Sequence, residues 1–181
     1  AAHGRLPASR RGVRDHPMTW QQPLPRLRPV VVVPALLVAL ALQTTWLQRI
    51  AVAGVAPDLV LVVALCAGLL DGPGSGAVYG ALGGLMQAYA QGLHLGSLGV
   101  TRALAAFLAG MVETRLLRDS VIVPMGTVLC CSLVAHAFYF VMAPELPVAR
   151  PLRIALVETG LNVLLAPFAY AFLTRWGRAY R

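Results

Sequence analysis

The feature that most constrains this chain is a series of long apolar stretches without a charged residue, separated by short polar breaks. Two of the longest run from about Val30 to Leu47 and from Val121 to Ala143. About 20 apolar residues in a helix cross a hydrocarbon layer of ~30 Å, because each residue adds ~1.5 Å. We therefore expect lipid to be the solvent for most of the side chains.

The composition supports a membrane protein and argues against a soluble domain. Apolar residues make up 58% of the 181 residues and charged residues only 12%, about half the share of a typical soluble domain. The net charge of +8 comes from arginines at the ends of apolar runs and in the N-terminal tail, which argues against a nucleic-acid partner. The three cysteines lie inside apolar runs without CxxC spacing, so we expect no disulfide framework and no metal site.

The order of apolar runs and breaks predicts an all-α integral membrane protein, a compact bundle of about six transmembrane helices. The expected spans are approximately residues 30–47, 57–70, 75–89, 96–116, 121–143 and 151–174, within one domain over 30–175. Residues 1–29, rich in Arg and Pro, are expected to form a disordered cytoplasmic tail, with Met18 as an alternative start. Residues 176–181 would be a short basic tail.

The arginines orient these spans. With a cytoplasmic N-terminus, the cytoplasmic segments hold eleven arginines and the outer loops three. The positive-inside rule therefore predicts that both termini are cytoplasmic.

Small residues repeat at helical spacing in the third and fourth spans. Residues four apart in a helix share one face, and small side chains let two helix backbones approach closely in lipid. The set consists of Gly76, Gly80, Gly83, Gly84, Ala106 and Gly110. We expect this face either to pack inside the bundle or to dock a partner helix.

Four polar residues inside the spans form a candidate intramembrane cluster. Arg102, His136 and Glu158 fall at a similar depth in the outer half, and Asn162 follows Glu158 by four residues. Ionisable groups in lipid usually pair or face a cavity. We expect an Arg102–Glu158 ion pair, with His136 or Asn162 hydrogen-bonded nearby. The cluster would fix helix register, line a small-ligand pocket or contact a partner.

Sequence motifs for catalysis are missing. There is no HExxH, no GxSxG, no paired acidic motif for a metal and no nucleotide-binding glycine loop. We therefore predict that the protein is not an enzyme and needs no cofactor or metal.

The succession of segments resembles the rod-shape-determining MreD family. Gln43-Thr44-Thr45 closes the first span, Pro57-Asp58 opens the second, the glycines follow in the third, and Ala106 to Gly110 ends the fourth. The resemblance covers about Leu36 to Arg118. One departure is Gln87, where family members often carry an acid.

The resemblance implies a non-enzymatic membrane scaffold of the bacterial cell-elongation complex in the inner (cytoplasmic) membrane, where it would help to position peptidoglycan synthesis. Its implied partners are MreC, then RodA and a class-B penicillin-binding protein within the complex, MreB filaments indirectly, and membrane lipid. The alternative is a substrate-binding membrane component of a vitamin transporter of the energy-coupling-factor type, to which the six-span layout is also similar. A vitamin pocket would lie at the depth of Arg102, His136 and Glu158.

Overall fold

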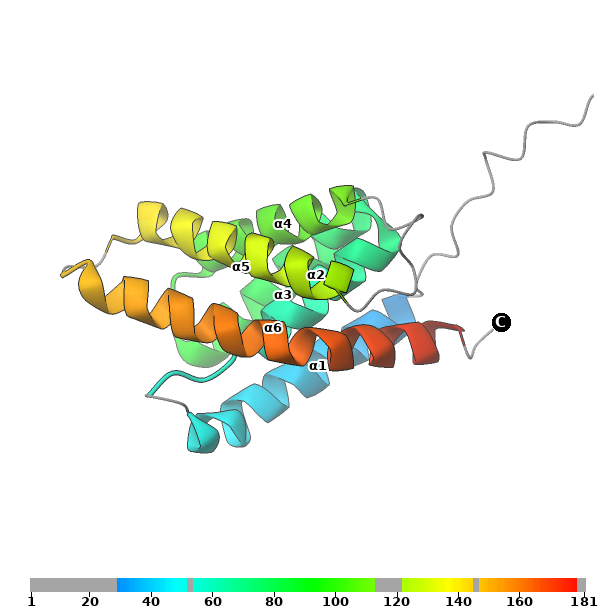
Figure 1. Ribbon diagram of the computed structural model, residues 1–181, viewed down its shortest axis with the longest axis horizontal. Helices are drawn as coiled ribbons and strands as arrows, with labels where there is room; N and C mark the ends of the chain where they lie inside the picture. The colour runs from blue at the N-terminus through cyan, green and yellow to red at the C-terminus, as the bar shows by residue number, and fades with distance from the viewer. Residues whose placement is uncertain (1–28, 52–53, 113–121, 145–146, 179–181) are drawn as a thin grey trace, which may run out of the picture.

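The computed structural model of the protein describes residues 29–51, 54–112, 122–144 and 147–178. Within these ranges the chain forms a short 3-10 helix, η2 (Leu47–Ile50), and six α-helices (Figure 1). The α-helices are α1 (Pro29–Thr45), α2 (Leu59–Asp71), α3 (Pro73–Gln91), α4 (Leu95–Met111), α5 (Ile122–Met142) and α6 (Ala149–Arg178). The predicted all-helical class is confirmed.

The described helices have the lengths and surfaces of a membrane bundle. Three stretches, Pro29–Arg49, Ile122–Met142 and Ala149–Trp176, are long and apolar enough to cross a bilayer, whereas α2 and α4 are shorter apolar helices. Large apolar side chains such as Val38, Val141 and Phe168 point outward, as lipid contact requires. Predictions for the N-terminal tail, for the link between the fourth and fifth spans, and for residues 179–181 lie outside the described residues.

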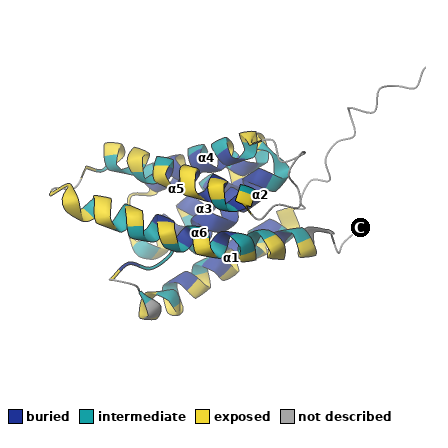
Figure 2. Ribbon diagram, in the orientation of Figure 1, coloured by how far each residue is buried: buried dark blue, intermediate teal, exposed yellow. Residues whose placement is uncertain are grey.

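The shortest of the described α-helices, α2, lies at the centre of the bundle. All ten residues from Val60 to Leu69 are buried, which Figure 2 shows as dark blue. Its 13 residues span only ~20 Å. Asp58 caps its start by accepting a hydrogen bond from the Leu61 amide (3.0 Å), and Gly72, with φ of 90°, ends it.

The small-residue face packs inside the chain, where α3 lies against α4. A Cβ added to Gly80 would lie 2.7 Å from the Arg102 carbonyl carbon, and one added to Gly84 would lie 2.9 Å from the Gly99 Cα. Gly83 faces α2, where an added Cβ would lie 2.9 Å from Val60 Cγ1. The other members make equally close approaches: Gly76 meets the backbone of Ala106, and Gly110 meets the backbone of Pro73. This face is therefore occupied by helices of the same chain.

The start of α1 and the end of α6 lie at the same end of the bundle (Figure 1). Val30 and Trp176 line one groove there. The connections between α1 and α2, between α3 and α4, and between α5 and α6 lie at the opposite end, which is predicted to face outward. The polar residues of the spans gather toward this opposite end.

Candidate functional site

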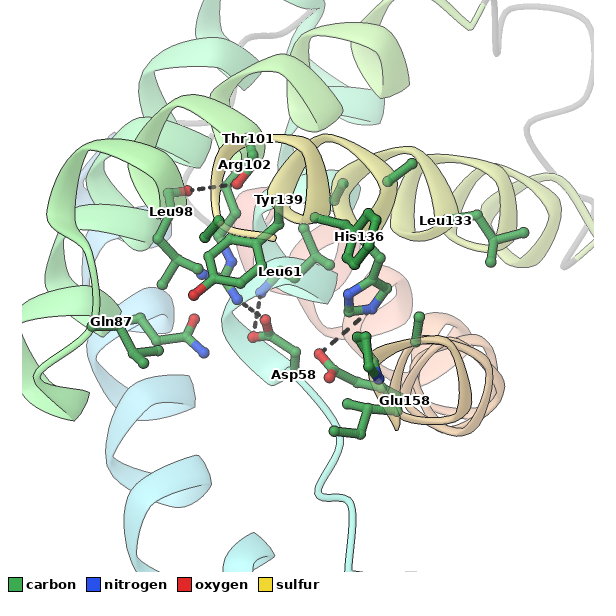
Figure 3. Close-up of a pocket in the computed structure, with 18 of the residues that line it drawn as sticks. Asp58, Leu61, Gln87, Leu98, Thr101, Arg102, Leu133, His136, Tyr139 and Glu158 are labelled. Atoms are coloured by element: carbon green, nitrogen blue, oxygen red, sulfur yellow. Dashed lines mark hydrogen bonds and ion pairs between the residues drawn. The ribbon is translucent and has the colours of Figure 1, made fainter. Parts of the chain in front are cut away.

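A cavity of about 520 Å³ opens between the three connections at the predicted outward end of the bundle. Gln48, Leu93 and Val148 line it, each from a different connection. Deeper in, its walls come from all six α-helices, with polar side chains gathered around the start of α2 (Figure 3). Small-molecule sites in proteins have volumes of roughly 300–1,000 Å³, so the cavity has the size of such a site.

Asp58 is the centre of the polar region. Its Oδ2 accepts a hydrogen bond and ion pair from Arg102 Nη2 of α4, while its Oδ1 caps α2. Its backbone N–H donates to Asn162 Oδ1 of α6 (2.8 Å). A further contact comes from α1, where Gln43 Oε1 accepts a hydrogen bond from the Val60 amide of α2 (3.3 Å). The start of α2 is thus held by polar contacts from α1, α4 and α6.

The ion pair that we expected between Arg102 and Glu158 is not the one formed. Arg102 pairs with Asp58, and Glu158 instead faces His136, with 3.8 Å between Glu158 Oε1 and His136 Nε2. The physical reason is position: the start of α2 places a carboxylate beside α4, so Arg102 has a partner at the cap. Both pairs line the same cavity, so the structure does bring Arg102, His136 and Glu158 together.

Three residues of the cavity wall carry buried polar atoms without a hydrogen-bond partner in the described part of the chain. These atoms are Arg102 Nε and Nη1, Gln87 Oε1 and His136 Nε2. An unpaired buried polar group costs ~1–3 kcal/mol, so folded proteins leave few of them. Ser132, Thr159 and Asn162 also carry unpaired buried atoms, but none of these three residues lines the cavity.

Sequence reasoning missed part of this site. Asp58 was assigned only to a motif at the start of a span, and Gln43 and Gln87 were not assigned to any site. The available signal was the cost of placing an amide in an apolar span, which applies to both glutamines. No three His, Cys, Asp or Glu residues of the described ranges are close enough together to hold a metal ion.

The comparison with protein families decides the assignment. The model of the five-transmembrane receptors of the LytS type, described as 5TMR of 5TMR-LYT, matches residues 18–171. The chain belongs to this 5TMR family. No curated protein and no solved structure matched it.

The 5TMR assignment corrects the resemblance to MreD, which was wrong. Spaced glycines and a Pro-Asp pair are common in tightly packed membrane helices, so their order was too weak a signal to separate the two families. The implied partners (MreC, RodA, a class-B penicillin-binding protein and MreB) rested on that resemblance alone.

Proposed function

We propose that this 5TMR chain is a membrane receptor domain that binds a small molecule in the cavity between its helices. The observation that carries the proposal is the set of unpartnered buried groups on the cavity wall, namely Arg102 Nε and Nη1 and Gln87 Oε1. Arg102 is 6% exposed and Gln87 3% exposed. A ligand that bonds these atoms would recover their desolvation cost, which gives binding energy and selects the ligand's orientation.

The chemistry of the wall narrows the class of ligand. Arg102 offers unused N–H donors and Gln87 offers an unused carbonyl acceptor. Since Asp58 already balances the charge of Arg102, this part of the wall favours hydrogen bonding over binding of a net charge. Leu98, Leu133 and other apolar side chains line the remaining wall. The proposed ligand has a polar head with both acceptors and donors, on an apolar or aromatic body.

The membrane topology belongs to the same proposal. The family is named for five transmembrane segments, whereas the described residues contain six α-helices. We infer that α2 crosses the membrane enclosed by the other helices and is not counted among the five lipid-facing segments. Two observations support this: α2 is buried along its length, and its length of ~20 Å is less than the thickness of the hydrocarbon layer. With α2 running inside the bundle, both termini are cytoplasmic and the cavity opens outward. The arginine distribution supports this orientation.

The experiment is to identify small molecules that co-purify with the protein. The protein would be purified in mild detergent, and its small-molecule extract compared by mass spectrometry with the extracts of two variants. Gln87→Met removes an unpartnered wall acceptor, whereas Thr174→Val alters α6 near its far end, away from the cavity. We expect a compound of the stated class with wild type and with Thr174→Val, reduced at least tenfold with Gln87→Met. Equal recovery from all three, or no compound, would show that the cavity is not a ligand site.

The second candidate is the substrate-binding component of a transporter, favoured by a cavity whose lining includes residues from the three connections at one end of the bundle. The two candidates differ in the fate of the bound compound. Vesicles that contain the protein and its co-purifying membrane partners would accumulate the identified compound if the chain serves transport. Binding without accumulation supports the receptor.

A further inference from the structure

A second hollow lies on the opposite side of α2, between α1 and α6. It has a volume of about 680 Å³ and is lined almost wholly by apolar side chains, among them Val30, Val38, Phe168 and Phe172. Its lining residues on α1 extend from Val30 to Leu42, a length of ~18 Å at 1.5 Å per residue. Since the hydrocarbon layer is ~30 Å thick, the groove has about the depth of one leaflet.

The end of this groove is marked by an aromatic pair and by positive charge. Phe172 and Trp176 stack with ring centroids 5.7 Å apart. Arg175 is exposed and follows Phe168 by seven residues and Phe172 by three, so it lies on the same face of α6. A tryptophan next to an arginine is typical of the level of the lipid headgroups.

We propose that the groove between α1 and α6 binds one anionic phospholipid of the cytoplasmic leaflet. An acyl chain would lie along the groove, and the headgroup phosphate would interact with Arg175. Charge complementarity selects this occupant, because the cation Arg175 lies at the end of the apolar groove and no acidic residue lines the groove. A second copy of this chain or a helix of another protein would place a negative charge beside Arg175 only if it carried an acidic residue at that position.

Quenching of Trp176 fluorescence by brominated lipid tests the site directly, because Trp176 lines the groove. The other two tryptophans, Trp20 and Trp46, would be changed to Phe. The protein would be reconstituted in phosphatidylcholine vesicles with a small fraction of dibrominated phosphatidylglycerol or of dibrominated phosphatidylcholine. We expect phosphatidylglycerol to quench at about a fivefold lower mole fraction, which corresponds to ~1 kcal/mol for one arginine near an anionic headgroup.

Two variants with matched controls locate the lipid. Arg175→Gln should remove the preference for phosphatidylglycerol, whereas Arg153→Gln, an exposed arginine near the other end of α6, should keep it. Val38→Phe should weaken quenching by filling the groove, whereas Val141→Phe, on the exposed surface of α5, should not. All four positions are exposed, so these substitutions leave the packed core intact.

Three outcomes would overturn the proposal. The first is equal quenching by the two brominated lipids. The second is an Arg175→Gln variant that behaves like Arg153→Gln. The third is that a second copy of the chain covers the groove and excludes lipid. In that case a Val38→Cys variant would crosslink between copies, and brominated lipid would not quench Trp176.

Discussion

The Arg102 guanidinium of α4 forms its ion pair with Asp58, the residue that caps the start of α2. The two side chains are 8% and 3% exposed, respectively, so the pair is almost fully removed from solvent. Asp58 therefore has two roles: it caps the central helix α2 and it lines the cavity. A single contact couples the position of α2 within the bundle to the shape of the proposed ligand site.

This pair leads to a first prediction, about stability. Removing one partner of a buried pair leaves an uncompensated charge, so Asp58→Asn and Arg102→Gln should each lower the free energy of unfolding by ~3–5 kcal/mol. The free energy of unfolding of the double variant should fall by clearly less than the sum of the two single losses, because neither charge is then left without its partner. Unfolding in mild detergent, followed by circular dichroism, measures all three. Strict additivity would show that the two side chains do not interact.

The sequence predicted the helices well because lipid imposes a simple rule: apolar runs become helices, and Asp71–Gly74 or Pro144–Pro147 interrupt them. It predicted a polar cluster for the same reason, since Arg102, His136 and Glu158 are costly in an apolar span. Two features could not be predicted from the sequence. The partner of Arg102 depends on how α2 is placed against α4, and the family depends on a pattern over the whole chain and not on a few motifs.

The glycine face gives the second prediction. Gly80→Ala should destabilise the protein by ~1–3 kcal/mol, because the new Cβ would lie 2.7 Å from a backbone carbon of α4 and would force the two helices apart. Gly126→Ala in α5 is the matched control, since no atom lies within 4 Å of its added Cβ. The control should be stabilised by ~0.5–1 kcal/mol, the difference in helix propensity. Thermal unfolding of both variants measures the contrast, and equal midpoints would contradict the close packing.

Gln87 gives the third prediction, which separates stability from binding. Its Oε1 is buried without a partner, so Gln87→Met removes an unsatisfied group and keeps the volume of the side chain. We expect the free energy of unfolding to stay the same or to rise by ~1 kcal/mol. Thermal unfolding of the ligand-free protein would detect the change. A marked loss of stability would show that Gln87 is paired in the folded state, and the case for a ligand at this position would weaken.

The fourth prediction concerns the side of the membrane on which the cavity opens. Val148 lies at the cavity mouth between α5 and α6, and Ala179 follows the last residue of α6 in the sequence. In a background with Cys66, Cys130 and Cys131 changed to Ala, a membrane-impermeant maleimide should label Val148→Cys in intact cells. It should label Ala179→Cys only after the membrane is opened, because α6 is long and apolar enough to separate the two positions.

The labelling pattern also tests the receptor proposal. A ligand from outside the cell reaches the cavity directly only if the mouth faces outward. The reverse pattern would place the mouth and its connections in the cytoplasm, against the arginine distribution, and the ligand would then have to be a cytoplasmic compound. Labelling of both positions from the same side would show that α6 does not cross the bilayer. That result would contradict the topology on which the outward-facing site depends.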